Sequence, residues 1–210
     1  MGTRLIPAGF FRLRYAGWHA VLEEIAMRSI AAVAAVTLTA LTVGAAFHAV
    51  AAHAQGTMKK GVLTVPIKKS DGSAAGTATF KESKDGKQLS ITVKLHDVPF
   101  GEHAVHVHAN PVCDAPDFKG AGGHFNPDTK QHGMDNAMGH HAGDMPKNIS
   151  VGENHMGEIT YKVDYLTLAP GAANSVLGHS IMVHEKADDM KTDPTGNAGN
   201  RIACGLITVQ

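Results

Sequence analysis

Short runs of alternating apolar and polar residues recur along the chain after residue 55. The clearest run spans 89–95, where every second residue is apolar: Leu89, Ile91, Val93 and Leu95. A period of two is typical of a β-strand with one buried face. Further strands are predicted at 62–67, 75–80, 103–108, 158–166, 180–184 and 202–209, and no helical segment of useful length is predicted after residue 55.

Residues that favour turns separate these runs. Ser70-Asp71-Gly72-Ser73 and Asp85-Gly86 each lie between two predicted strands. Many short strands joined in this way favour antiparallel pairing. The sequence therefore predicts an all-β fold, an antiparallel Greek-key β-sandwich or barrel.

The strand pattern disappears between Asn110 and Val151. This stretch is rich in His, Gly, Asp, Asn and Pro. A loop of that length inside a compact domain needs something to hold it in place. A metal ion and a disulfide are the candidates, because the stretch contains residues suited to both. A second, shorter irregular stretch is predicted at 187–200.

Residues 1–54 differ from the remainder of the chain. A positive start at Met27-Arg28-Ser29 precedes an uncharged apolar run over 30–47, and Ala52-His53-Ala54 follows. These are the parts of a secretory signal peptide. We predict an N-terminal extension plus signal peptide at 1–54, with translation starting at Met27 and cleavage after Ala54, and one domain at 55–210. An uncleaved membrane anchor is the open alternative, since the run is about long enough to span a bilayer.

Charge and cysteine content narrow the range of functions. Lys+Arg and Asp+Glu both number 19, so the chain lacks the basic excess of a nucleic-acid-binding protein. Its two cysteines, Cys113 and Cys204, favour one disulfide in an exported protein. Two free thiols remain the alternative. Metal-ligating cysteines are disfavoured because neither has a C-x-x-C partner.

Histidine is the unusual residue of this chain, with 14 copies. His106 and His108 lie two apart in a predicted strand, so both point to one face and can reach one ion. Six histidines and one aspartate form the candidate set: His106, His108, His124, His132, His141, Asp144 and His184. Imidazole suits copper and zinc, and a carboxylate can complete a tetrahedral zinc site. Unconnected buried histidines are the alternative, and they are costly without partners.

These motifs, taken in order, resemble the copper/zinc superoxide dismutase family in its bacterial exported form. The matching segments are 106–108, 113, 121–127, 130–133, 141–144, 184–189, 196–199, 201 and 203–205. The resemblance covers essentially all of 57–210. Two departures are Ala104, where the family usually has glycine, and a short stretch at 190–196.

The resemblance implies two metal sites with one shared ligand. The positions that match the copper ligands are His106, His108, His124 and His184. The positions that match the zinc ligands are His124, His132, His141 and Asp144. His124 would therefore contact both ions through its two ring nitrogens.

The resemblance also assigns roles around the metals. Asp188 matches the carboxylate that orients one histidine of each site, here His106 and His132. Arg201 matches the arginine beside copper that attracts the anionic substrate. Cys113 and Cys204 match the family's disulfide.

The function implied is disproportionation of superoxide to dioxygen and hydrogen peroxide. One copper and one zinc per chain are the implied cofactors, with His124 and Arg201 as the catalytic residues. We expect an enzyme of antioxidant defence that is periplasmic or otherwise exported, without stable membrane insertion after cleavage. Bacterial members occur as monomers and as dimers, so a homodimer is left open.

Two other functions fit parts of the pattern. A copper-binding or copper-delivery protein on the same scaffold would need no turnover, and loss of a copper ligand or of Arg201 would favour it. A sandwich stabilised only by zinc would not need the copper-side histidines. Five further histidines lie in the domain. His140 adjoins His141 and is an alternative to it, but the spacing to Asp144 favours His141. The other four are predicted to be strand-end or surface residues: His96, His103, His155 and His179.

Overall fold

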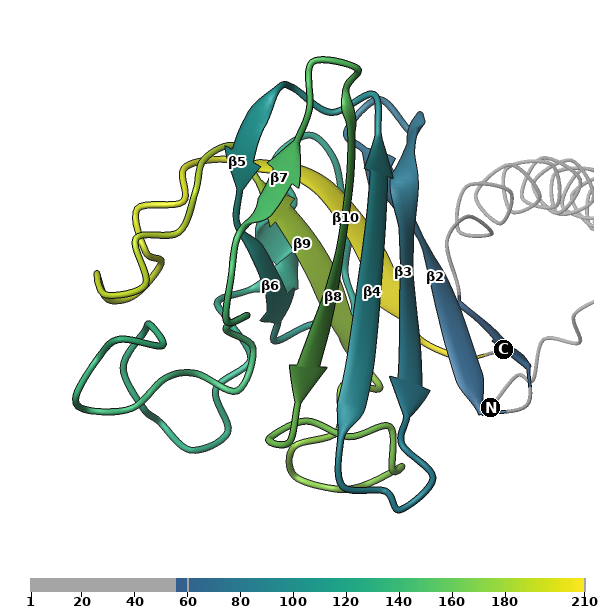
Figure 1. Cartoon of the computed structure of the whole chain (residues 1–210), viewed down its shortest axis with the longest axis vertical. Helices are drawn as coiled ribbons and strands as arrows, with labels where there is room; N and C mark the ends of the chain where they lie inside the picture. Colours follow the sequence, from purple (N-terminus) through teal and green to yellow (C-terminus); the bar gives the residue numbers. More distant parts are fainter. Residues whose placement is uncertain (1–55, 60, 210) are drawn as a thin grey trace, which may run out of the picture. The chain divides into compact units, whose positions relative to one another are not determined.

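In a computed structural model, the described residues are 56–59 and 61–209, and they form an antiparallel sheet that curls on itself (Figure 1). This confirms the predicted fold class. The predicted signal peptide and its cleavage site lie outside the described residues. No helix in 56–59 or 61–209 combines the length and apolar character needed to cross a membrane.

Ten strands and one short 3₁₀ helix make up the fold. The strands are β1 (Thr57–Lys59), β2 (Val62–Lys69), β3 (Ala74–Glu82), β4 (Leu89–His96), β5 (Gly101–His103), β6 (Val105–His108), β7 (Ile149–Val151), β8 (Met156–Val163), β9 (His179–His184) and β10 (Arg201–Ile207). The helix η1 is Lys119–Ala121. The main sheet has the order β6-β9-β10-β2-β3-β4-β8, with β1 paired to β2, and β5 pairs with β7 in a second small sheet.

Most predicted strands are present, with some local differences, and β1 was not predicted. The run predicted at 103–108 is divided at Ala104, whose N–H donates to the carbonyl of Lys186 instead of to a neighbouring strand (2.8 Å). The strand predicted at 158–166 ends at Val163. β7 lies inside the stretch that was predicted to lack strands, because its three residues carry too little pattern to be recognised.

The alternation of side chains on β6 and β9 separates the core from the functional face. Val105 and Val107 on β6, and Ile181 and Val183 on β9, point into the main hydrophobic core. Each fully buried side chain of this kind contributes about 1.5–3 kcal/mol. The intervening residues, which include both histidines of β6, therefore point to the opposite face.

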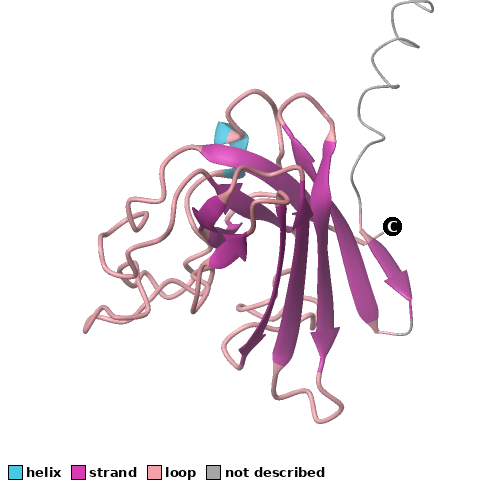
Figure 2. Ribbon diagram, turned by 45° about the horizontal axis from the view of Figure 1, so that its top comes forward, coloured by secondary structure: helices cyan, strands magenta, loops and turns pink. Residues whose placement is uncertain are grey.

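Two long loops cover that face. They follow β6 and β9, and they extend from the same side of the barrel (Figure 2). The disulfide Cys113–Cys204 joins the start of the first loop to β10, with a Cα–Cα distance of 5.7 Å, which confirms the predicted bond. It closes a chain separation of 91 residues, a restriction on the unfolded chain of about 4–5 kcal/mol in the chain-entropy model.

Candidate metal centre

Segments of the first loop fold back along the free edge of β6. The Val107 N–H donates to the carbonyl of Gly143 (2.9 Å), and the Val107 carbonyl accepts from the N–H of Phe125 (2.8 Å). The Gly143 N–H donates to the carbonyl of Phe125 (2.8 Å). A Cβ at Gly143 would lie 2.1 Å from the Val107 oxygen, so only glycine permits this approach. His124 and Asp144, which adjoin these residues, are thereby held beside β6.

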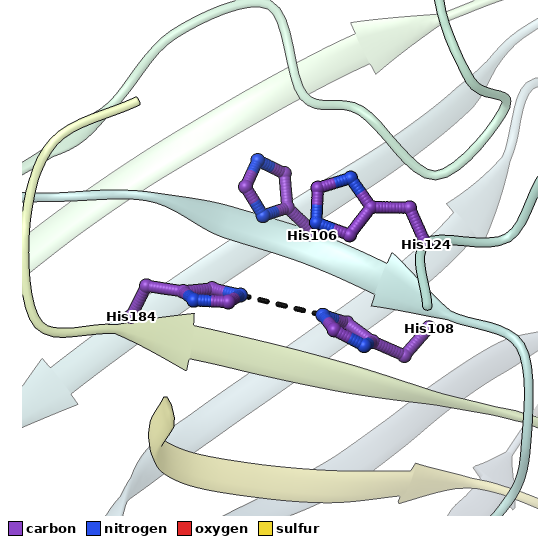
Figure 3. A group of neighbouring side chains, drawn as sticks. All are labelled: His106, His108, His124 and His184. Atoms are coloured by element: carbon purple, nitrogen blue, oxygen red, sulfur yellow. Dashed lines mark hydrogen bonds between the residues drawn. The ribbon is translucent and has the colours of Figure 1, made fainter. Parts of the chain in front are cut away.

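Four imidazoles converge between β6, β9 and this loop (Figure 3). His106, His108, His124 and His184 are all buried, and one ring nitrogen of each lies within 4.8 Å of the others. The Nε2 atoms of His108 and His184 are 3.3 Å apart. His108 Nδ1 donates to the carbonyl of Gly122 (2.9 Å), so its Nε2 carries a lone pair directed at His184.

The other two imidazoles of this group each have one unpaired nitrogen. His106 Nε2 is bonded to Asp188 and His124 Nδ1 to Asp144, both at 2.8 Å. His106 Nδ1 and His124 Nε2 are buried without a hydrogen-bond partner. Buried polar atoms are rarely left unpaired. A cation bound by four nitrogens satisfies both of them, and the all-imidazole donor set suits copper.

A second group is centred on one carboxylate oxygen. Asp144 Oδ1 lies 2.8 Å from His124 Nδ1, 3.0 Å from His132 Nδ1 and 3.3 Å from His141 Nδ1. Asp144 Oδ2 accepts from the main-chain N–H groups of Gly133 (2.9 Å) and His141 (3.0 Å), which fixes the carboxylate. Three imidazole nitrogens and one carboxylate oxygen form a donor set suited to tetrahedral zinc.

Both His106 and His141 lie near this second group. By distance alone His106 also fits it, because its ring lies within 4.8 Å of ligand atoms of His124, His132 and Asp144. Its Nε2 is occupied by Asp188, however, and its other nitrogen belongs to the all-histidine group. His141 Nδ1 lies 3.3 Å from both Asp144 Oδ1 and His124 Nδ1, so His141 is the better fourth member.

Asp188 connects the two groups. Its Oδ2 is 2.8 Å from His106 Nε2, and its Oδ1 is 2.9 Å from His132 Nε2. The main chain of Asp188 is held by Asn148, which donates to its carbonyl (3.0 Å) and accepts from its N–H (2.8 Å). Asn148 was missed in the sequence, because a loop asparagine carries no sign of such pairing.

Burial and local charge set the protonation of these rings. Burial, with a contribution from His106, lowers the pKa of His124 to about 3 and that of His184 to about 2. Burial also lowers the pKa of His108. In contrast, burial alone would lower the pKa of His132, but Asp144 and Asp188 outweigh it and raise this pKa to about 9. Neutral imidazole is the form that binds a metal, so the low pKa values favour ligation.

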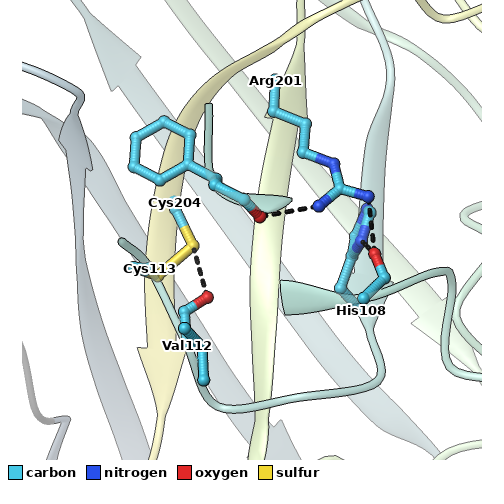
Figure 4. Close-up of a disulfide and its surroundings, with 7 residues drawn as sticks. His108, Val112, Cys113, Arg201 and Cys204 are labelled. Carbon is cyan, nitrogen blue, oxygen red and sulfur yellow. Dashed lines mark hydrogen bonds between the residues drawn. A yellow bond between two sulfur atoms is a disulfide. The ribbon is translucent and has the colours of Figure 1, made fainter. Parts of the chain in front are cut away.

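Arg201 lies at the edge of the all-histidine group (Figure 4). Its Nη1 donates to the carbonyl of Phe118 (2.6 Å) and its Nη2 to the carbonyl of Gly122 (2.5 Å). The Gly122 carbonyl also accepts from His108. Arg201 is paired with His184 across β9 and β10. The guanidinium is therefore a positive charge held beside the histidines, since the Gly122 carbonyl contacts both Arg201 and His108.

The remaining histidines belong to neither group. His96, His155 and His179 are partly or largely exposed, as predicted. His103 was predicted as a strand-end or surface residue, and it ends β5 but is 2% exposed. Its two ring nitrogens lie 2.8 Å from the carbonyl oxygens of His184 and Pro99. The sequence gives no sign of this burial, since it depends on how Ala104 interrupts the strand.

Comparison with known proteins identifies the family. The family model for copper/zinc superoxide dismutase matches residues 74–207. The chain belongs to this family. Among similar proteins, Superoxide dismutase (Cu-Zn) 1 of Aquifex aeolicus is 40% identical over 139 residues, which cover 65% of this chain and 81% of that protein. The superoxide dismutase-like protein YojM of Bacillus subtilis is 38% identical over 141 residues, 65% of this chain and 71% of the relative.

Solved structures agree with the superoxide dismutase fold. A superoxide dismutase-like protein from Bacillus subtilis has a TM-score of 0.64 at 37% identity, covering 69% of this chain and 97% of that one. The copper/zinc superoxide dismutase of Brucella abortus has a TM-score of 0.58 at 28% identity, and the match covers 70% of this chain and 99% of that one. Family membership makes the chain an oxidoreductase that uses copper and zinc to disproportionate superoxide.

The pKa values predict that the metal-free protein loses stability on mild acidification. His124 and His184 have folded pKa values of about 3 and 2, against an ordinary 6.5. Protons therefore bind the unfolded chain preferentially below pH 6.5, and the free energy of unfolding falls there by about 1.4 kcal/mol per pH unit for each such group. His132 acts in the opposite sense, because its contribution is complete below pH 6.5 and is lost as the pH rises through about 9.

Urea unfolding of chelator-treated protein between pH 4.5 and 9.5 measures this effect. Maximum stability is expected near neutral pH, with a decline on both sides. A free energy of unfolding that is constant between pH 7 and 5 would contradict the burial of neutral imidazoles in the metal-free state.

Proposed function

We propose that the chain disproportionates superoxide at a copper ion held by four imidazoles, beside a zinc ion that shares one of them. The proposed copper ligands are His106, His108, His124 and His184. The proposed zinc ligands are His124, His132, His141 and Asp144. One observation carries the proposal: His106 Nδ1 and His124 Nε2 are buried without partners, beside two further Nε2 atoms 3.3 Å apart.

The reaction converts two superoxide ions and two protons to dioxygen and hydrogen peroxide. Copper, when bound, supplies the one-electron couple that this exchange requires, whereas zinc has no redox chemistry. His124 is the residue suited to proton handling, because its Nδ1 belongs to the zinc group while its Nε2 has no other protein partner. We assign the transferred proton to His124 Nε2.

The zinc group serves to hold the long loop and its ligands in place. Asp144 contacts the Nδ1 atoms of three imidazoles, among them His132. Asp188 bonds His132 through one carboxylate oxygen and His106 through the other, so it fixes both rings relative to each other. A ring held at its outer nitrogen presents a fixed tautomer and direction to the metal. The copper-side His106 is thereby positioned by residues of the zinc side.

Arg201 is the proposed electrostatic guide for the substrate. Guanidinium stays protonated in proteins, and here two carbonyl oxygens hold it beside the copper group. A fixed positive charge at the mouth of a site raises the rate at which an anion reaches it.

We also propose that the working protein is exported. A disulfide persists in oxidising compartments, and Cys113–Cys204 is formed. The sequence pattern of 1–54 supplies a matching signal peptide, so the proposed mature domain is 55–210 in the periplasm or an equivalent compartment. Antioxidant defence outside the cytoplasm is the corresponding role.

The copper-delivery alternative receives less support. A carrier needs a pathway for releasing copper but not a fixed guanidinium beside the site. All four imidazoles of the copper group and Arg201 are retained, and each has defined partners. A domain stabilised only by zinc would leave the buried copper-side nitrogens unexplained.

Substitution of one copper-side ligand tests the assignment. In His184→Ala we expect copper binding and dismutase activity to be lost, by more than the about 10- to 100-fold that removal of an outer partner costs. Zinc content should remain near that of the unmodified protein. His179→Ala is the matched control, because His179 lies on the same strand and belongs to neither group. Metal analysis measures the copper and zinc content of both variants, and the decay of superoxide measures their activity. Full activity in His184→Ala would contradict the assignment.

Removal of the Arg201 charge should slow substrate capture. We expect Arg201→Ala to lower kcat/KM about tenfold at low salt, near the lower end of electrostatic steering effects. The remaining activity should depend less on ionic strength. Arg201→Lys keeps the charge but not the hydrogen bonds to two carbonyl groups, so its kcat/KM should fall less than that of Arg201→Ala. Equal salt dependence in Arg201→Ala and the unmodified enzyme would rule out a guiding role.

A further inference from the structure

Two aromatic side chains lie outside the proposed zinc group and touch each other. Tyr165 follows β8, and His140 immediately precedes His141 in the loop. Their ring centroids are 4.6 Å apart, with the rings edge to face at 63°. Both line a pocket of about 380 Å³ together with Lys130 and Asn174. Neither side chain is used in the function proposed above.

The Tyr165 hydroxyl contacts the main chain of the central zinc-side residue. It donates to the carbonyl of Asp144 at 2.8 Å. Asp144 is the residue whose Oδ1 meets three imidazole nitrogens, so any rotation of its backbone would displace that oxygen from all three. Tyr165 thus holds the main chain of Asp144, while the side chain of Asp144 faces the imidazoles.

Tyr165 is itself fixed to the barrel. Asn174 Nδ2 donates to the Tyr165 carbonyl (3.1 Å). Three residues further along, the Leu168 N–H donates to the Glu82 carboxylate at the end of β3 (2.7 Å). The hydroxyl therefore links a loop without regular structure to a part of the chain that the sheet holds in place.

His140 makes the corresponding contact to a second zinc-side residue. Its Nδ1 donates to the carbonyl of His141 at 2.7 Å. The ring is held in that direction by its contact with Tyr165. Two touching rings therefore bond the carbonyl groups of two of the four proposed zinc ligands. His140 and His141 themselves lie in no strand or helix.

We propose that Tyr165 and His140 form an outer clamp that positions Asp144 and His141 for zinc. Both are positioning residues, acting through the main chain of the ligands. The inference deepens the proposed function and rests on its zinc assignment. Partners that orient metal ligands commonly change metal affinity by about 10- to 100-fold when removed.

Two tyrosines four residues apart, Tyr161 in β8 and Tyr165 just after it, provide a matched test. Tyr165→Phe removes a hydroxyl that holds Asp144, while Tyr161→Phe removes a buried hydroxyl with no hydrogen-bond partner. Zinc affinity is measured on the full metal-free chain by competition with a chromophoric chelator. We expect the zinc dissociation constant to rise about tenfold in Tyr165→Phe and to stay unchanged in Tyr161→Phe.

A second readout separates positioning from general stability. The increase in Tm on adding zinc should be smaller in Tyr165→Phe than in Tyr161→Phe. Lower Tm values with equal increases, and unchanged zinc affinity, would overturn the clamp while leaving the zinc site intact. A chain that binds no zinc before substitution would overturn both the clamp and the zinc assignment.

His140→Ala provides an independent variant. It removes a partly exposed ring outside the core, so it tests the clamp even where Tyr165→Phe fails to fold. We expect weaker zinc binding here as well, with smaller magnitude because the Tyr165 bond to Asp144 remains. Unchanged zinc affinity in His140→Ala would remove His140 from the clamp, and in both variants it would overturn the proposal.

Discussion

Six imidazoles and two carboxylates are buried together at one side of the barrel, and the surrounding structure depends on how that burial is compensated. Five imidazole nitrogens lie within 3.3 Å of the carboxylate oxygens of Asp144 and Asp188. Two more nitrogens have no protein partner. A buried polar atom without a partner costs free energy comparable to a lost hydrogen bond. A cation bound at the all-histidine group would remove that cost, so metal binding there would stabilise the folded state.

The barrel strands hold some of the proposed ligands, and the long loop holds the others. β6 and β9 contribute three of the histidines from a face opposite the hydrophobic core. The loop contributes its ligands only because it pairs with the edge of β6 and is tied to β10 by the disulfide. His124 and Asp188 then join the two groups, so a change on the zinc side reaches the copper side through fixed hydrogen bonds. Arg201 is connected to the same hydrogen-bond network, since Arg201 and His108 both bond the Gly122 carbonyl.

Sequence reasoning predicts the parts of this site that follow from periodicity and motif. The period of two in β6 is enough to place His106 and His108 on one face, and the order of the motifs is enough to suggest two metal groups. The resemblance to the family also implies which side chains converge. The main-chain bonds of Gly143 and Phe125 that bring them together were not predicted, because a loop rich in glycine has no pattern that indicates such bonds.

Other features were missed for related reasons. Asn148, His103 and Tyr165 act through carbonyl and N–H groups of residues distant in the chain. Such contacts are set by tertiary structure and leave no local pattern. β7 is too short to show an alternation, and the break at Ala104 reflects its bonds to the segment after β9. Residues that bind metals carry a chemical signal in the sequence, whereas residues that position them do not.

The central claim is that two different ions occupy the two groups and share His124. A crystal structure of the copper- and zinc-loaded protein, with anomalous data collected at both absorption edges, tests it most directly. The account predicts a copper peak bounded by His106 Nδ1 and the Nε2 atoms of His108, His124 and His184. It predicts a separate zinc peak bounded by Asp144 and the Nδ1 atoms of His124, His132 and His141. A single shared peak, or a zinc peak bounded by His106 in place of His141, would contradict it.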